Sequence, residues 1–239
     1  MSRNTRKKRS GSKKWIIILF SIIGILAVTG AVVFMHGRSL QSRTDTADVE
    51  TTEESFQFPY TSEDGNIQFL SLIQFTGPNP DAENAVSEDI AGLQIQNISE
   101  QYLKEADVKV LMEDGTEYHF LVKDLPAGSE TVAFDLSNQS YDGQAVCREI
   151  QCTAQTGESS MGEERVEIST DESKLIITNI SDQQIENAAV IYRCSTGDSY
   201  IGGISYEITV SELAAGESFE FEDTACIFGT PEAVGVEID

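Results

Sequence analysis

The chain has 239 residues and a formal net charge of −24, a length that allows one or two small domains. The charge is unevenly distributed, because residues 1–43 contain nine Lys and Arg and no acid, whereas the chain from residue 44 onward holds all 40 acids and seven bases. A surface carrying about −33 repels nucleic acid. The composition therefore argues against a DNA- or RNA-binding protein.

The first element in chain order is a predicted transmembrane helix. Residues 15–35, WIIILFSIIGILAVTGAVVFM, contain no charge, and at about 1.5 Å per residue they extend about 31 Å, the thickness of a bilayer core. More basic residues precede this run than follow it, which predicts a cytoplasmic N-terminus. Trp15 lies where an interfacial aromatic anchor is expected. The residues that set this topology are Arg6, Lys7, Lys8, Arg9, Lys13 and Lys14.

A cleavable signal peptide has a similar layout of basic and then apolar residues. Residues 29–31, Thr-Gly-Ala, loosely fit a cleavage site, but the apolar run continues beyond them and is longer than a usual signal sequence. A retained anchor is therefore favoured, with residues 1–14 as a basic cytoplasmic tail. Residues 36–55 are polar and predict a tether rather than a folded segment.

The part of the chain beyond the tether contains an internal repeat. At an offset of 82 residues, ten of the 26 positions from Leu93 to Tyr118 are identical to their counterparts from Leu175 to Tyr200. After Tyr200 the second copy has six extra residues before the match resumes at Leu213. Two copies of one small domain are therefore expected.

Apolar residues alternate with period two in each copy, as in residues 93–95, 108–110 and 190–192. This spacing is typical of half-buried β-strands. Turn-forming sequences separate the runs, among them Asn-Ile-Ser at residues 97–99 and Pro-Ala-Gly at residues 126–128. The pattern predicts an all-β ectodomain of two tandem antiparallel β-sandwiches that follow one N-terminal transmembrane helix.

The second copy carries a longer pattern: Leu-x-Ile-x-Asn-Ile-Ser at 175–181, Ala-x-Val-x-Tyr at 188–192, and Leu-Ala-Ala-Gly-Glu-Ser-x-x-Phe at 213–221. This pattern resembles the small immunoglobulin-like domains of bacterial envelope proteins that are described by an F-x-L-Y-D motif. Neither copy contains that string itself, and Pro126-Ala127-Gly128 keeps part of the family's turn. The resemblance implies a binding or spacing role at a cell surface and no catalytic residues.

The expected boundaries follow from the repeat. Repeat one covers residues 56–152, a Gly-, Ser- and acid-rich linker covers 153–164, and repeat two covers 165–239. Repeat one has a predicted loop at residues 76–88 with no counterpart in repeat two. That loop is either a tolerated insertion or a binding loop.

All four cysteines lie beyond the predicted membrane anchor, where disulfides persist. Cys194 with Cys226 is the favoured pair, and in the chain-entropy model this disulfide would stabilise the folded state by about 3–4 kcal/mol. Cys147 and Cys152 are five residues apart and point to opposite faces of an extended strand. They pair only across a sharp turn; otherwise both are free, or Cys147 bridges to the other copy.

Candidate catalytic and metal residues are few. His36 and His119 are the two histidines, and no zinc-protease, P-loop or dinucleotide fingerprint is present, so no catalytic residue, metal ligand or cofactor is predicted. Calcium is the one cation that the abundant carboxylates suit, and the acidic turns at residues 62–65, 113–115 and 171–172 are where it would bind. Acidic residues in tight turns are also common without a metal.

These observations predict a single-pass protein of the cell membrane, with the bilayer as one partner through residues 15–35 and an extracellular C-terminal ectodomain. The expected function is that of a tethered binding or scaffold protein that presents two β-sandwich repeats to a protein or other macromolecule of the cell envelope. The alternative is a structural subunit or spacer that acts through its transmembrane helix. A sensor is disfavoured, since the cytoplasmic tail is too short to carry an output.

Overall fold

The computed structural model describes residues 56–158, 164–171, 173–227 and 229–238, all within the compact unit Thr51–Asp239. The regular elements among the described residues are β-strands and one short 3-10 turn, joined by turns and irregular segments. The prediction of an all-β fold with packed sheets is therefore confirmed for this part of the chain. None of the described helical segments is long and apolar enough to cross a membrane.

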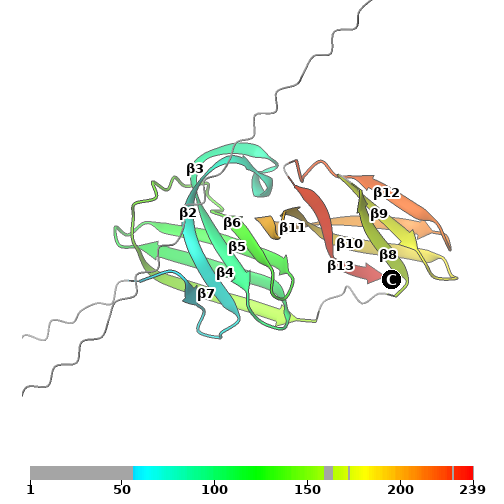
Figure 1. Cartoon of the computed structure of the whole chain (residues 1–239), viewed down its shortest axis with the longest axis horizontal. Helices are drawn as coiled ribbons and strands as arrows, with labels where there is room; N and C mark the ends of the chain where they lie inside the picture. Colours follow the sequence, from blue (N-terminus) through cyan, green and yellow to red (C-terminus); the bar gives the residue numbers. More distant parts are fainter. Residues whose placement is uncertain (1–55, 159–163, 172, 228, 239) are drawn as a thin grey trace, which may run out of the picture. The chain divides into compact units, whose positions relative to one another are not determined.

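The first half of the described chain contains seven strands and the 3-10 turn (Figure 1). In chain order these are β1 (Tyr60–Thr61), β2 (Ile67–Asn79), η1 (Pro80–Ala82), β3 (Ala85–Asn97), β4 (Tyr102–Met112), β5 (Glu117–Leu125), β6 (Glu130–Phe134) and β7 (Cys147–Gly157). They pair in the orders β1-β2-β3-β6 and β5-β4-β7.

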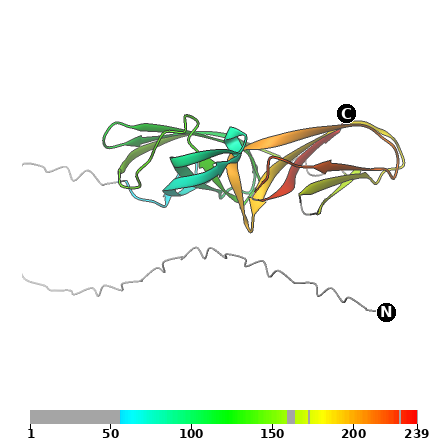
Figure 2. The same ribbon diagram turned by 90° about the horizontal axis from the view of Figure 1, so that it is seen from above.

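The second half contains six strands and repeats this arrangement. They are β8 (Val166–Asp171), β9 (Lys174–Asn179), β10 (Ile185–Thr196), β11 (Ser199–Leu213), β12 (Ser218–Glu222) and β13 (Thr230–Ile238). The order β8-β9-β12 matches β2-β3-β6, and the order β11-β10-β13 matches β5-β4-β7. The long strands β10 and β11, yellow to orange in Figure 2, run antiparallel over most of their length.

One sheet continues from the first half into the second. Strand β6 pairs in parallel with β11 through Tyr200 opposite Thr131 and Ile201 opposite Val132. This pairing joins four strands of the first half to three of the second, in the order β1-β2-β3-β6-β11-β10-β13. The two sequence repeats are therefore hydrogen-bonded to each other through the backbone.

The cores form where the alternating apolar residues of facing sheets meet. In β4, Ala106, Val108 and Val110 are fully buried, as the period-two pattern predicts. The same core cluster contains Tyr200 and Val234 from the second half. The second half has its own clusters, one around Val190 in β10 and one around the disulfide.

The repeated Asn-Ile-Ser turn has the same structure in both halves. Asn97 is fully buried, and its Nδ2 donates to the carbonyl oxygens of Gln101 (2.8 Å) and Leu125 (3.0 Å). Asn179 is likewise buried and donates to Gln183 (2.8 Å) and Leu213 (2.9 Å). These side chains satisfy buried carbonyl groups, which gives the motif a structural reason to occur in both copies.

Two predicted boundaries differ from the structure. Residues 76–88 were expected to form a loop, but β2 and β3 extend through most of them as a long hairpin that curves at its end, shown in cyan in Figure 1. Strand β7 continues to Gly157, five residues into the predicted linker. Residues 153–157 have the polar composition of a linker, because β7 lies at a sheet edge and its Thr and Gln side chains reach solvent.

Candidate functional site at the junction of the halves

The tip of the β2–β3 hairpin packs closely against β11 at the adjacent glycines Gly202 and Gly203. The Asp81 carboxylate accepts hydrogen bonds from the backbone N–H of Gly203 (2.6 Å) and of Ile204 (3.2 Å). A Cβ atom on Gly203 would lie 2.0 Å from the carbonyl oxygen of Leu121, and one on Gly202, where φ is +90°, would lie 2.6 Å from Asp81 Oδ1. Only glycine permits this approach of the two halves.

Local sequence shapes the hairpin tip for this contact. Asn79 is almost fully buried; its Oδ1 accepts from the Asp81 N–H (2.9 Å), and its Nδ2 donates to Asn138 Oδ1 (3.1 Å). Glu83 and Asn84 then take left-handed backbone conformations that reverse the chain. These bonds hold Asp81 in place at the end of the hairpin.

Two further hydrogen bonds attach the tip to the second half. The Tyr206 hydroxyl donates to the Pro80 carbonyl oxygen (2.9 Å). Asn84 Nδ2 donates to the carbonyl oxygen of Thr224 (3.3 Å), in the loop that carries Cys226. The segment predicted as an insertion or a binding loop therefore binds the other half of its own chain.

A fully buried arginine lies at the centre of the junction. Arg193 Nη2 donates to Thr131 Oγ1 (2.9 Å) and to the Gly202 carbonyl oxygen (2.5 Å). Its Nη1 donates to the carbonyl oxygens of Gly203 (3.2 Å) and Lys123. One guanidinium thus binds backbone groups of both halves at once.

The charges at the junction compensate one another. Burial lowers the pKa of Arg193 to about 10, so the side chain remains charged at neutral pH. Burial raises the pKa of Asp81 from 3.8, while the hydrogen bonds from β11 and the charge of Arg193 act in the opposite direction. The Arg193 guanidinium also lies over the ring of Tyr200, 5.3 Å from its centroid.

A cleft of about 490 Å³ opens beside this junction and is lined from both halves. We call it the junction cleft, and its lining residues are Glu100, Gln101, Tyr102, Pro126, Ala127, Ser129, Gly157, Glu158, Tyr200, Glu232, Ala233 and Val234. A smaller depression of about 250 Å³ shares Ser129, Tyr200 and Glu232 with it and adds Asp198. The volume of the junction cleft is typical of ligand sites in proteins.

The junction cleft combines an aromatic wall with negative charge. Burial and the neighbouring Glu232 carboxylate raise the pKa of Tyr200, and burial beside Asp124 raises that of Tyr102, so both phenols are neutral at physiological pH. Glu100, Glu158 and Glu232 are exposed at the cleft. The Lys104 side chain lies over Gly157, one of the lining residues, and so places a positive charge next to that side of the cleft.

The predicted Cys194–Cys226 disulfide is present, with Cα atoms 5.1 Å apart. Asp223 lies beside it and accepts hydrogen bonds from the Tyr192 hydroxyl (2.8 Å) and the Cys226 N–H (2.5 Å). Within the part of the chain that the structure describes, Cys194, Asp223 and Cys226 form the one cluster of metal-ligand type. Because the two sulfurs are bonded to each other, the cluster does not fit a metal ion.

Cys147 and Cys152 are both free. Both lie in β7, and both pack at the core of the first half. Burial raises the pKa of the Cys147 thiol to about 11 and that of Cys152 to about 12. Neither therefore has the properties of a reactive cysteine.

Two of the three acidic turns proposed for calcium use a carboxylate within the turn, and the third contains Glu172, which lies outside the described residues. Asp64 accepts hydrogen bonds from Ser62 Oγ (2.6 Å) and Asn66 Nδ2 (3.0 Å), and these bonds lower its pKa. Asp114 accepts from the backbone N–H of Thr116 (2.9 Å). Both carboxylates thus already have hydrogen-bond partners in the turn.

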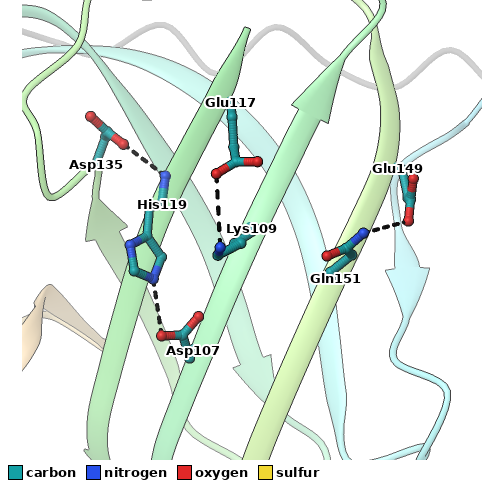
Figure 3. A network of polar contacts seen from close by, with 7 residues as sticks. All are labelled: Asp107, Lys109, Glu117, His119, Asp135, Glu149 and Gln151. Carbon is teal, nitrogen blue, oxygen red and sulfur yellow. Dashed lines mark hydrogen bonds and ion pairs between the residues drawn. The ribbon is translucent and has the colours of Figure 1, made fainter. Parts of the chain in front are cut away.

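His119 belongs to a network of polar contacts on sheet β5-β4-β7 (Figure 3). Its Nε2 lies 3.0 Å from Asp107 Oδ2, and its backbone N–H donates to Asp135 (2.8 Å). On the same strands, Lys109 pairs with Glu117 at 3.9 Å. The Asp107–His119 and Lys109–Glu117 contacts are cross-strand pairs of partly exposed side chains, the arrangement that stabilises a solvated sheet face.

The predicted anchor lies outside the described residues, and so do Trp15, the basic cluster Arg6, Lys7, Lys8, Arg9, Lys13 and Lys14, and the tether. Asp81, Arg193, Gly202 and Gly203 were not predicted from the sequence as functional residues. One signal was available for Arg193, which lies next to Cys194 and is the one charged residue of the run 188–194. No protein-family model matches the chain, and no curated protein matches it.

Proposed function

We propose that the protein is a single-pass membrane protein that presents its β-rich part to a macromolecular partner in the cell envelope, on the extracytoplasmic side. The apolar run at residues 15–35 and the basic tail before it support the anchor and the topology. The twice-repeated strand order supports a pair of immunoglobulin-like sandwiches of the F-x-L-Y-D type.

The observation that carries the proposal is that the two halves form a joined unit with a cleft where they meet. Arg193 and Asp81 each bind backbone groups across the junction, and these hydrogen bonds oppose independent movement of the two repeats. A cleft lined from both halves keeps its shape only if that junction is fixed. Rigid walls reduce the entropy lost on binding, which suits a recognition site.

A purely structural role through the transmembrane helix makes a different prediction. We would replace residues 15–35 of the full-length chain with an unrelated apolar span of equal length and isolate both proteins from solubilised envelopes. A tethered binding protein keeps its co-purifying partner after this exchange. Loss of that partner from a correctly inserted, folded variant would instead favour the structural subunit.

A further inference from the structure

We propose that the junction cleft binds a basic segment of a partner protein, with a lysine or arginine side chain inserted between the two halves. This inference rests on the proposed function and names the chemistry of its partner. It combines three features of the cleft: its charge, its apolar wall and its construction from two halves.

The charge favours a cationic ligand. Glu100 comes from the turn after β3, Glu158 follows β7 and Glu232 lies in β13, so carboxylates approach the cleft from both halves. Among the lining residues there is no Lys or Arg. Carboxylates gathered around a concave site provide specificity for cations and raise the rate of association.

The apolar wall favours a side chain with an alkyl stem over a bare metal ion. Pro126, Ala233 and Val234 line the cleft with Tyr200, and their surfaces suit the methylene groups of lysine or arginine. Arg193 supports the Tyr200 ring from within the junction. A lysine or arginine would thus place its stem against this wall and its charged end near the carboxylates.

Lys104 provides an internal comparison. Its side chain lies over Gly157, at one wall of the cleft, and so places a positive charge where it would repel a cationic ligand. Removing that charge should strengthen binding, whereas removing the carboxylates should weaken it. A merely structural role for these residues does not predict effects of opposite sign.

The test uses full-length protein in nanodiscs of zwitterionic lipid, with empty nanodiscs as a blank. The probe is a fluorescent eight-residue peptide of alternating lysine and alanine, and the same peptide with glutamate replacing lysine is the control. Binding is followed by anisotropy at low and at physiological salt. We expect saturable binding of the lysine peptide that weakens with salt, and no binding of the glutamate peptide.

Matched variants separate the cleft from general attraction to an acidic protein. Glu100→Gln with Glu232→Gln should weaken binding about ten-fold, or about 1.4 kcal/mol. The pair Glu167→Gln and Glu186→Gln removes the same charge from exposed positions in β8 and β10, outside the cleft, and should change affinity less than two-fold. Lys104→Gln should tighten binding.

Insertion of charge at the rim gives a second, independent comparison. Ala127 is exposed in the turn that lines the cleft, so substitution there leaves the cores intact. Ala127→Arg should weaken binding, and Ala127→Gln should not. Unchanged thermal unfolding would show that each variant is folded.

Equal losses in the cleft and control pairs, or no binding of the lysine peptide, would overturn the inference. If the peptide fails while the anchor-exchanged chain still retains its envelope partner, the proposed ligand class is wrong and the proposed function stands. If the anchor-exchanged chain also loses its partner, the proposed function fails as well.

Discussion

The Asp81 carboxylate and the Gly203 amide join two segments separated by 122 residues, at a distance of 2.6 Å. Both segments are the places where the two sequence repeats differ. Asp81 lies at the tip of the β2–β3 hairpin, whose strands have 13 residues each where the counterparts β8 and β9 have six. Gly203 lies in β11, which has 15 residues where its counterpart β5 has nine. The additions to each copy thus meet and form the junction.

Substituting Gly203 by alanine tests the close approach at the junction. The added Cβ would lie 2.0 Å from the Leu121 carbonyl oxygen, so the backbone of one half must shift. We expect a loss of unfolding free energy of about 3 kcal/mol, the upper end for overpacking. Gly216→Ala is the control, because a Cβ atom added there would have no neighbouring atom within 4 Å. Since φ is +75° at Gly216, only the backbone cost of a left-handed alanine, about 1 kcal/mol, is expected. Equal losses in the two variants would contradict the account.

A double-mutant cycle tests whether Asp81 and Arg193 act together. Arg193→Leu leaves buried carbonyl groups without donors and should cost about 3–5 kcal/mol. Asp81→Ala should also destabilise the protein, but by less in the Arg193→Leu background, giving a coupling of about 1–2 kcal/mol. Urea unfolding of the four proteins measures it. Strictly additive losses would show that the two side chains act separately.

The pKa of Asp64 predicts a pH-dependent contribution to stability. Its folded-state pKa is lowered from 3.8, chiefly by the hydrogen bond from Ser62, so ionised Asp64 favours the folded state. This contribution is present above pH 3.8 and is lost as the pH falls through the lowered value. Asp64→Asn should therefore lower the melting temperature at pH 6 and have less effect at pH 3. A melting-temperature difference between the variant and the wild-type protein that grows towards pH 3 would contradict the assignment.

The free cysteines should be protected in the folded protein. Because burial raises both thiol pKa values, neither Cys147 nor Cys152 should react rapidly with a disulfide reagent at pH 8. Unfolding without a reductant should expose two thiols per chain, since Cys194 and Cys226 are bonded to each other. Rapid reaction of the native protein, or no thiol after unfolding, would disprove this assignment.

Local features of the fold could be predicted from the sequence. The period-two pattern located strands such as β4 and β10, and the repeated Asn-Ile-Ser turn located equivalent corners at Asn97 and Asn179. The Cys194–Cys226 pair was predicted because Cys194 continues the inward alternation of the residues before it in its strand. Each of these signals depends on residues that are near in sequence or are repeated.

The junction could not be predicted, because it depends on contacts between unrepeated segments. The 76–88 segment contains glycine and proline and resembles a loop, although its ends continue the β2–β3 ladder. Arg193 lies beside register shifts in β10, which turn three successive side chains inward and interrupt the alternation. A charged residue at such a position looks exposed in the sequence, but here it is fully buried.

Calorimetry of the full-length protein in detergent tests most directly the claim that the junction makes the two halves one unit. We predict a single unfolding transition whose calorimetric and van't Hoff enthalpies agree. Gly203→Ala with Asp81→Ala should separate it into two transitions, because most residues of each core come from one half. Two independent transitions in the wild-type protein, neither shifted by these substitutions, would contradict the account.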